Sequence, residues 1–219
     1  MTEHVFVTRH GARIDNGPDA DRGWLSKAGH GRRDDPHLSS SGKIAAEELA
    51  AALANGGVFG QASHIICSPY VRCIETADAV AKRFGLPIKV EDGLSEVGTA
   101  AHTVLPLAEL QQQFPSIDRS YDPVVPRSEI PLEHGDGQAA KRACAAATDV
   151  RQRLSGPLLL VGHGASCLGL VQAFGGSGYV GYTSLSHFAR EDGGEWRLRG
   201  QQGDVSHLTD QATALRSAW

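Results

Sequence analysis

Arginine, histidine and glutamate side chains recur in this 219-residue chain directly after short apolar runs. The cationic and imidazole positions are Arg9, His10, Arg13, Arg72 and His163, and the carboxylate is Glu96. This set suits phosphoryl transfer, because arginine forks bind phosphate oxygens bidentately and a neutral imidazole can attack phosphorus. A carboxylic acid can then protonate the leaving oxygen. The residues predict an anion-binding catalytic site without a metal ion, since the guanidinium groups supply the positive charge.

Each of these residues also has an ordinary structural explanation. Taken singly, the arginines suit surface charges, His10 suits a core histidine, and Arg72 suits an ion pair with Glu75 one helical turn away. His163 lies between two glycines, which indicates that the backbone there closely approaches another group. The occurrence of the whole set at successive strand ends favours the catalytic interpretation.

The elements that must position these side chains alternate between apolar strands and helices. Strands are expected at residues 4–8, 64–67, 88–90 and 158–161, with a terminal hairpin over 184–199. Helices are expected at about 39–55, 69–84, 106–113 and 138–154, and again after residue 164. This alternation predicts an α/β fold, a three-layer α/β/α sandwich with a mainly parallel central sheet. Sites in such sheets form at the carboxyl ends of the strands, where we expect the side chains named above to meet.

Capping signals set the expected helix starts. Ser39 or Ser40 is suited to cap the first helix, and Ser68 to cap the second, followed by Pro69 as its first residue. Gly85 is expected to end that second helix.

The length predicts one domain over residues 1–219, with insertions at about 14–36 and 93–136. The first insertion is too long for an ordinary connection, and the second is expected to cover the sheet edge. Both are expected to shape the entrance to the site, where Arg22, Arg32 and Arg33 are candidates for binding a second anionic group. The aromatic candidates for stacking or packing there are Trp24, Tyr121 and Tyr182.

Charge and cysteine usage limit the class of protein further. The formal net charge of −4 argues against a broad nucleic-acid surface, and no apolar run reaches the ~18 residues of a membrane helix. The four cysteines lack the C-x-x-C spacing of zinc and redox motifs. We therefore expect a reduced, cytoplasmic protein with no cofactor, no metal, no nucleic-acid partner and no membrane partner, and leave a homodimer open.

Three motifs together resemble the histidine phosphatase superfamily, which has a phosphoglycerate-mutase-like fold. They are Thr-Arg-His-Gly at 8–11, Ser-Pro-x-x-Arg-x-x-x-Thr at 68–76 and Gly-His-Gly at 162–164. Finer features are similar to the phosphatase domain of suppressor-of-T-cell-receptor-signalling proteins and of ecdysteroid-phosphate phosphatase. These features lie at residues 9–13, 35–42, 72–77, 90–96 and 117–123. The resemblance spans about residues 5–199.

The resemblance implies a role for each residue of the set. His10 would accept the phosphoryl group, Glu96 would donate a proton to the leaving group, and the phosphate would be held by Arg9, Arg13, Arg72 and His163. Glu91 and Glu75 are alternative proton donors, and His163 is the next. The implied activity is that of a phosphoric monoester hydrolase acting on a phosphorylated small molecule or a phosphoprotein.

Two positions depart from the pattern of this branch. Ala12 stands where the branch usually has Glu, and Val97 stands where it usually has an aromatic residue. Both changes alter the expected pocket wall.

Other functions remain as alternatives. A phosphoglycerate-type mutase of the same superfamily is one, although its Glu-Arg-His-Tyr-Gly run is absent. A non-catalytic interaction domain is another. A serine hydrolase would use Ser166, in a near match to the G-x-S-x-G turn, with His207 and either Asp192 or Asp204. A cysteine phosphatase is excluded, because four residues rather than five separate Cys67 from Arg72.

Overall fold

The computed structural model describes residues 2–28, 34–98 and 104–216, and contains a six-stranded sheet in the order β3-β2-β4-β1-β5-β6. The strands are β1 (Thr2–Arg9), β2 (His64–Cys67), β3 (Ile88–Val90), β4 (Leu158–Gly162), β5 (Leu185–Glu191) and β6 (Arg197–Asp204). β1 to β4 are parallel, β5 is antiparallel to β1, and β6 is antiparallel to β5. The predicted α/β fold with a mainly parallel sheet is confirmed.

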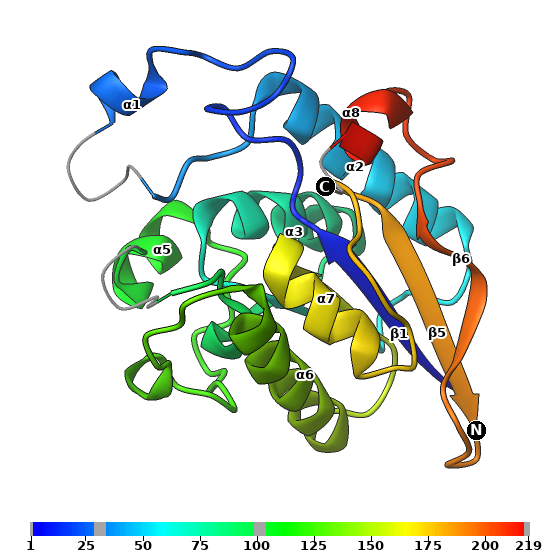
Figure 1. Cartoon of the computed structure of the whole chain (residues 1–219). Helices are drawn as coiled ribbons and strands as arrows, with labels where there is room; N and C mark the ends of the chain where they lie inside the picture. Colours follow the sequence, from blue (N-terminus) through cyan, green and yellow to red (C-terminus); the bar gives the residue numbers. More distant parts are fainter. Residues whose placement is uncertain (1, 29–33, 99–103, 217–219) are drawn as a thin grey trace.

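Helices cover both faces of this sheet (Figure 1). The helices α2 (Ser40–Asn55) and α3 (Val71–Phe84) pack on one face, and α6 (Asp136–Arg153) and α7 (Gly164–Gln172) pack on the other. Alternate side chains of β1 enter the two cores, with Phe6 toward α2 and α3 and its neighbours Val5 and Val7 toward α6 and α7. The result is three layers.

Helix starts follow the capping signals in one case and depart from them in another. The Ser39 hydroxyl accepts a hydrogen bond from the backbone N–H of Gly42 at 3.1 Å, as a cap of α2 should. The expected cap at Ser68 is wrong, because Tyr70 occupies the position before the first turn and Ser68 still belongs to the sheet, where its N–H donates to the carbonyl of Val161 at 3.1 Å. α3 therefore begins only at Val71.

Other boundaries agree within a few residues, and two short helices are additional. The hairpin forms as β5 and β6, and the two later helices appear as α5 (Leu107–Gln113) and α6. The helices α1 (Trp24–Lys27) and α8 (Gln211–Arg216) were not expected, because four or six residues are too few for an apolar period. Within the described ranges, no helix is long and apolar enough to cross a membrane.

The carboxyl ends of the parallel strands lie level with one another. Arg9 is in register with Gly162, and Cys67 is in register with both Val161 and Val90. The ladder continues one residue further, since the N–H of His10 donates to the carbonyl of Gly162 at 3.0 Å. The residues that follow these strands are thereby brought to one edge of the sheet.

The segment 93–136 extends the sheet beyond β3. Ile117 forms a parallel bridge with Ile88, and the N–H of Asp118 donates to the carbonyl of Ile88 at 2.8 Å. Short turns flank this contact, namely η1 (Asp92–Leu94) and η2 (Arg127–Glu129). The part of the segment around Ile117 therefore lies beside β3, at the edge of the sheet.

Candidate active site

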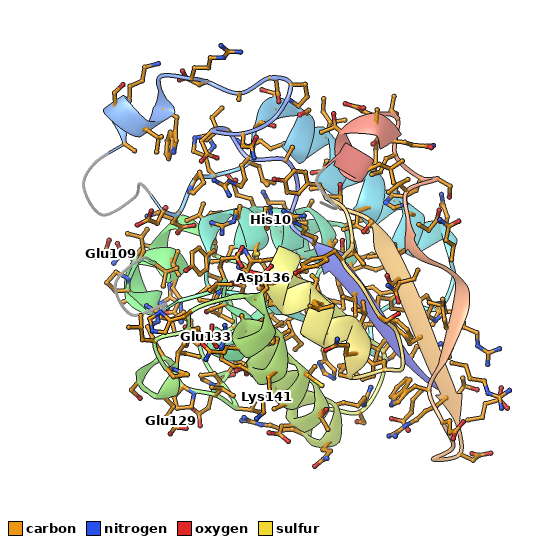
Figure 2. All side chains as sticks on the ribbon, in the orientation of Figure 1. His10, Glu109, Glu129, Glu133, Asp136 and Lys141 are labelled. Carbon is orange, nitrogen blue, oxygen red and sulfur yellow. The ribbon has the colours of Figure 1, made fainter. Side chains whose placement is uncertain are left out.

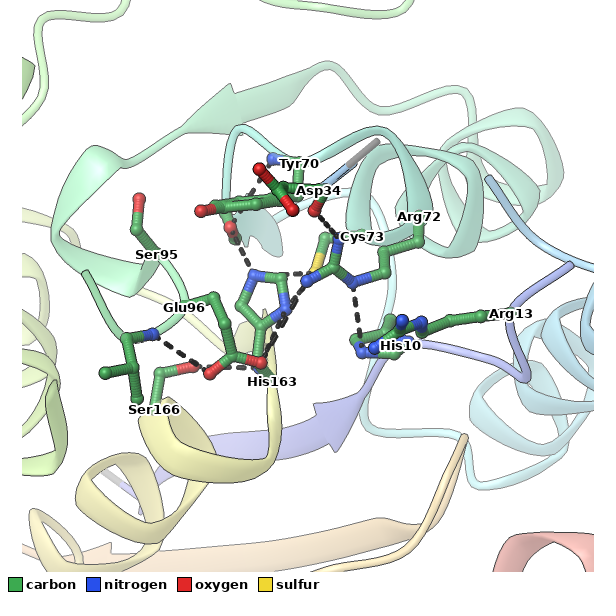
Figure 3. Close-up of polar contacts among 12 residues, drawn as sticks. His10, Arg13, Asp34, Tyr70, Arg72, Cys73, Ser95, Glu96, His163 and Ser166 are labelled. Carbon is green, nitrogen blue, oxygen red and sulfur yellow. Dashed lines mark hydrogen bonds and ion pairs between the residues drawn. The ribbon is translucent and has the colours of Figure 1, made fainter. Parts of the chain in front are cut away.

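His10 follows β1 and is buried, with 1% of its surface exposed. Its Nδ1 lies 2.8 Å from the carbonyl oxygen of Gly11. Its Nε2 lies 3.3 Å from Nε of Arg72, a contact that Figure 3 shows. The carbonyl accepts and the guanidinium donates, so this pair of contacts places the imidazole proton on Nδ1. Nε2 therefore carries the lone pair and is directed toward the arginine.

The surroundings of His10 favour the neutral imidazole. Burial lowers its pKa well below the ordinary value, and the charges of Arg72, Arg9 and Arg13 lower it further. The hydrogen bond to Gly11 acts in the opposite direction and is outweighed. The nitrogen that faces Arg72 is therefore available as a nucleophile at neutral pH.

Arg72 is held rigidly in the first turn of α3 and is 2% exposed. Its Nη1 lies 3.5 Å from Oδ1 of Asp35 and 3.5 Å from the carbonyl oxygen of Asp34. Oδ1 of Asp35 also accepts from the N–H of Val71 at 2.9 Å, so one carboxylate holds both the helix start and the arginine. The guanidinium stacks over the ring of Tyr70, 4.5 Å from its centroid.

His163 follows β4 and is completely buried. Its Nε2 lies 2.7 Å from the Ser68 hydroxyl, and its Nδ1 lies 3.6 Å from Oε2 of Glu96. Burial, followed by the charge of Arg72, lowers the pKa of His163 well below its usual value. Ser68 is a site residue that the sequence did not identify. Its Ser-Pro context favours a helix cap, although the same motif carries the signal for the site.

Glu96 is the carboxylate that reaches this cluster, and its side chain is 30% exposed. Its Oε2 lies 3.9 Å from Nη2 of Arg72, in addition to the contact with His163.

The two alternative proton donors, Glu91 and Glu75, bond other groups. Glu91 is fully buried and accepts hydrogen bonds from Tyr121, Gly93, Val124 and Val125. Glu75 accepts from the N–H of Leu38 rather than pairing with Arg72.

The two remaining arginines lie beside His10 in different ways. The guanidinium of Arg9 stacks on the ring of Tyr182, 4.3 Å from its centroid, and that ring lies 5.3 Å from the His10 ring. Tyr182 is thus the one aromatic candidate of the three that the structure places against His10. Trp24 packs against His37, and the Tyr121 hydroxyl donates to Glu91.

Arg13 forms a bidentate pair with Asp15, with Nε and Nη2 at 2.8 and 2.5 Å from the carboxylate oxygens. Its charge still lowers the pKa of His10. Asp15 was not considered from the sequence, and a phosphate at this arginine must share it with that carboxylate. Of the arginines considered for a second anionic group, Arg22 is exposed, and Arg32 and Arg33 lie outside the described residues.

The contacts around Gly162 and Ser166 serve packing and do not match the serine hydrolase alternative. A Cβ atom on Gly162 would lie 2.7 Å from the Ser166 hydroxyl, so this glycine lets α7 pack closely on β4. The Ser166 hydroxyl accepts from the N–H of His163 at 2.8 Å. His207 instead pairs with the carbonyl of Thr183 at 3.0 Å. These contacts do not form the Ser–His–Asp triad of a serine hydrolase.

The polar side chains of the site are mainly guanidinium and imidazole groups, and not the grouped carboxylates that bind divalent cations. Among residues 2–28, 34–98 and 104–216, no cluster of three or more His, Cys, Asp or Glu side chains is arranged to hold a metal ion. The cysteines Cys67, Cys73, Cys144 and Cys167 are free. Cys73 lies beside the site, with its Sγ 3.5 Å from Nε2 of His163, but burial raises the pKa of its thiol well above the ordinary value.

Comparison with known proteins places this arrangement among relatives. Ubiquitin-associated and SH3 domain-containing protein A of Homo sapiens is 27% identical over 196 residues, covering 74% of this chain and 29% of that protein. The chain thus spans less than a third of that relative's length. Ecdysone phosphate phosphatase from Bombix mori, solved with tungstate, has a TM-score of 0.66 at 20% identity, covering 91% of this chain and 92% of that one. Bacillus stearothermophilus YhfR has a TM-score of 0.60 at 24% identity, covering 94% and 99%.

The family model of the histidine phosphatase superfamily (branch 1) matches residues 5–201. That range begins in β1 and ends in β6, so it includes every strand end from which a site residue comes. The resemblance that the motifs indicated is confirmed. The chain belongs to the histidine phosphatase superfamily, branch 1.

Proposed function

We propose that this chain hydrolyses a phosphomonoester through a phosphohistidine on His10, without a metal ion. One observation carries the proposal: Nε2 of His10 faces Arg72 at 3.3 Å while Nδ1 is held by the carbonyl of Gly11 at 2.8 Å. Nε2 is thus unprotonated and lies beside a guanidinium that can bind an anion, so a phosphate held by Arg72 would bring its phosphorus atom close to this nitrogen.

The first chemical step forms the covalent intermediate. Nε2 of His10 attacks the phosphorus atom while the bond from phosphorus to the ester oxygen breaks. Glu96 gives its proton to that leaving oxygen. Arg9, Arg72 and His163 donate to the equatorial oxygens and offset their charge, and Arg13 adds a further donor at the entrance.

The second step returns the enzyme to its starting state. A water molecule attacks the phosphorus atom of phosphohistidine, and Glu96, now a carboxylate, takes a proton from that water. The nitrogen–phosphorus bond breaks, which releases inorganic phosphate and restores neutral His10 and protonated Glu96. The carbonyl of Gly11 stabilises the imidazole through both steps, because it accepts the Nδ1 proton while Nε2 carries the phosphoryl group.

The proposed substrate is a phosphorylated small molecule or a phosphoprotein. The branch position that usually carries Glu is Ala12, which is buried against the start of α2. A Cβ atom on Gly42 would lie 2.2 Å from the carbonyl oxygen of Ala12, so the loop after β1 is pressed against this helix.

Rapid quench with a ³²P-labelled aryl phosphate tests the intermediate. We expect a protein-bound label that is stable in base and lost in acid, as for a phosphoramidate. His10→Ala should lose both the label and turnover, by about 10⁴-fold or more. His64→Ala, at the opposite end of the same sheet, is the control and should keep both. Full activity in His10→Ala would overturn the proposal.

Two further measurements separate the alternatives. Hydrolysis should survive EDTA and be inhibited by vanadate or by tungstate, the oxyanion bound in the ecdysone phosphate phosphatase structure. Activity lost in EDTA and restored by a divalent ion would contradict the metal-independent mechanism. A mutase would instead keep its label until a phosphate acceptor is added and then transfer it to that acceptor rather than to water.

A further inference from the structure

The proton donor lies in a part of the chain that has no sheet or helix to hold it. Glu96 follows the short turn η1, and residues 95–98 belong to neither a helix nor a strand. Among residues 2–28, 34–98 and 104–216, the one backbone group that bonds its own carboxyl group is the N–H of Val97, at 3.0 Å. The backbone polar groups of such a segment need partners from elsewhere in the molecule.

A single side chain from α6 supplies these partners. Nη1 of Arg142 donates to the carbonyl oxygen of Gly93 at 2.6 Å. One N–H of Nη2 is shared between the carbonyl oxygens of Ser95 and Glu96, at 3.1 and 3.2 Å. The guanidinium therefore joins the end of η1 to the backbone of the proton donor itself. These contacts run to the main chain, so Arg142 does not compete with a substrate for the Glu96 carboxyl group.

Arg142 is itself fixed by a second carboxylate. Its Nε and Nη2 each lie 2.8 Å from an oxygen of Glu133, and the two side chains are 7% and 2% exposed. Figure 2 shows Glu133 beside α6, well away from His10. A buried bidentate pair of this kind has one orientation, because the carboxylate matches the guanidinium fork. Glu133 thus determines where the remaining N–H groups of Arg142 point.

Close packing on the same helix supports this attachment. A Cβ atom on Gly93 would lie 2.6 Å from Cβ of Ala146, one helical turn after Arg142. Gly93 is therefore in contact with α6, and Arg142 bonds the backbone two and three residues later, at Ser95 and Glu96. The charge of Arg142 also reaches the site, where it helps to lower the pKa of His163.

We propose that Arg142, oriented by Glu133, is the positioning residue that sets Glu96 against the leaving group. The inference rests on the proposed function and adds a residue that touches neither phosphate nor His10. Lysine cannot replace it, because one ammonium group cannot pair bidentately with Glu133 and at the same time reach three carbonyl oxygens.

The test compares leaving groups in single-turnover bursts. An alkyl phosphate needs the proton from Glu96, whereas 4-nitrophenyl phosphate hardly does. Arg142→Lys should slow the alkyl substrate by about 10²-fold, the lower end of the range for general acid catalysis, and the nitrophenyl substrate by under about threefold. Arg151→Lys is the matched control, because Arg151 lies buried on the same helix, bonds backbone carbonyls and pairs with Glu3. It should leave both rates unchanged.

A double variant distinguishes positioning from a general structural effect. If Arg142 acts through Glu96, then Arg142→Lys in a Glu96→Gln background should slow the alkyl substrate by no more than about threefold beyond Glu96→Gln alone. Multiplied losses would overturn the inference, and so would equal losses on both substrates in the single variant. If Arg142→Lys does not fold, Glu133→Gln replaces it in the test, because this change keeps the shape of the side chain and weakens its pairing with Arg142. It should slow the alkyl substrate far more than the nitrophenyl substrate.

The outcomes also separate this inference from the proposed function. If the proposed function is wrong, Glu96→Gln itself will not discriminate between the two substrates, or His10→Ala will remain active. If Glu96→Gln discriminates and both Arg142→Lys and Glu133→Gln do not, the proposed function stands and the positioning role is refuted.

Discussion

The two halves of the candidate site are built in different ways: the half around His10, which we propose holds the phosphate, and the half around Glu96, which we propose donates the proton. His10, Arg72 and His163 follow β1, β2 and β4 within a few residues and are at most 2% exposed. Glu96 lies in the irregular segment after β3, and its side chain is 30% exposed. In the first half, sheet register places the side chains. In the second half, Arg142 from α6 bonds the backbone carbonyl groups around Glu96.

This difference has a physical reason. Phosphate has the same shape in every phosphomonoester, so the groups that bind it can be buried and rigid at the ends of strands. The leaving group differs from one substrate to another, and the residue that protonates it must stand where the remainder of the substrate enters. An open segment held by a few hydrogen bonds allows that region to vary while the sheet stays constant. Variants in the two halves should therefore behave differently.

The largest effect is expected from the rigid half. Arg72→Lys keeps the charge but loses the fork that spans His10, Asp35 and the approach to Glu96. Hydrolysis of both alkyl and aryl phosphates should fall by about 10³–10⁵-fold, the range for an arginine that stabilises phosphoryl transfer. Arg83→Lys, exposed at the other end of α3, is the control for kcat/KM. A loss confined to alkyl phosphates would place Arg72 with the donor half instead.

The donor half should show a smaller loss that depends on the substrate. Glu96→Gln should slow an alkyl phosphate by about 10²–10⁴-fold and a nitrophenyl phosphate much less, provided transfer to His10 is rate-limiting. Single-turnover measurement isolates that step. Glu109→Gln, exposed on α5, should change neither rate. Equal losses on both substrates would show that Glu96 activates water or supports structure.

Ser68 tests whether the rigid half depends on tautomer as well as position. Its hydroxyl lies 2.7 Å from Nε2 of His163, so donation to that nitrogen leaves the proton on Nδ1, which faces Glu96. Ser68→Ala should lower kcat about tenfold with both leaving groups, as removing the partner of a functional histidine commonly does. Ser63→Ala removes another buried hydroxyl beside β2 and is the control. An unchanged kcat would contradict the assignment.

The smallest expected effect is on the pH dependence of stability. The pKa of His10 is lowered in the folded protein by burial and by Arg72, so below about pH 6.5 the unfolded chain binds a proton that the folded protein does not. The free energy of unfolding should therefore be fully retained above that pH and decrease as the pH falls below it. In urea titrations at pH 7.5 and 5.5, His10→Asn should lose less stability than the wild type. An equal loss in both proteins would contradict this prediction.

The sequence by itself determined the sheet and the residues that its strand ends carry. Short apolar runs of four or five residues that alternate with helical patterns favour buried parallel strands, so the positions after residues 8, 67 and 161 followed from length and pattern. The motifs around His10, Arg72 and His163 then indicated the family. The ends of the helices were less certain. Ser68 fits a cap by residue type, but only the register of β2 against β4 shows that its N–H remains in the sheet.

Tertiary structure alone decided which carboxylate lies beside Arg72 and His163, and which side chain bonds its backbone. Glu75, Glu91 and Glu96 carry the same functional group and lie near the same strands. They differ in their partners: the Glu91 carboxylate accepts from backbone N–H groups, and the Glu75 carboxylate accepts from the N–H of Leu38. Arg142 lies 46 residues after Glu96 and has no motif of its own. The role that we propose for it rests on its contacts to backbone carbonyls. Every residue has a carbonyl, so no pattern of side chains in the sequence can indicate which of them an arginine will bind.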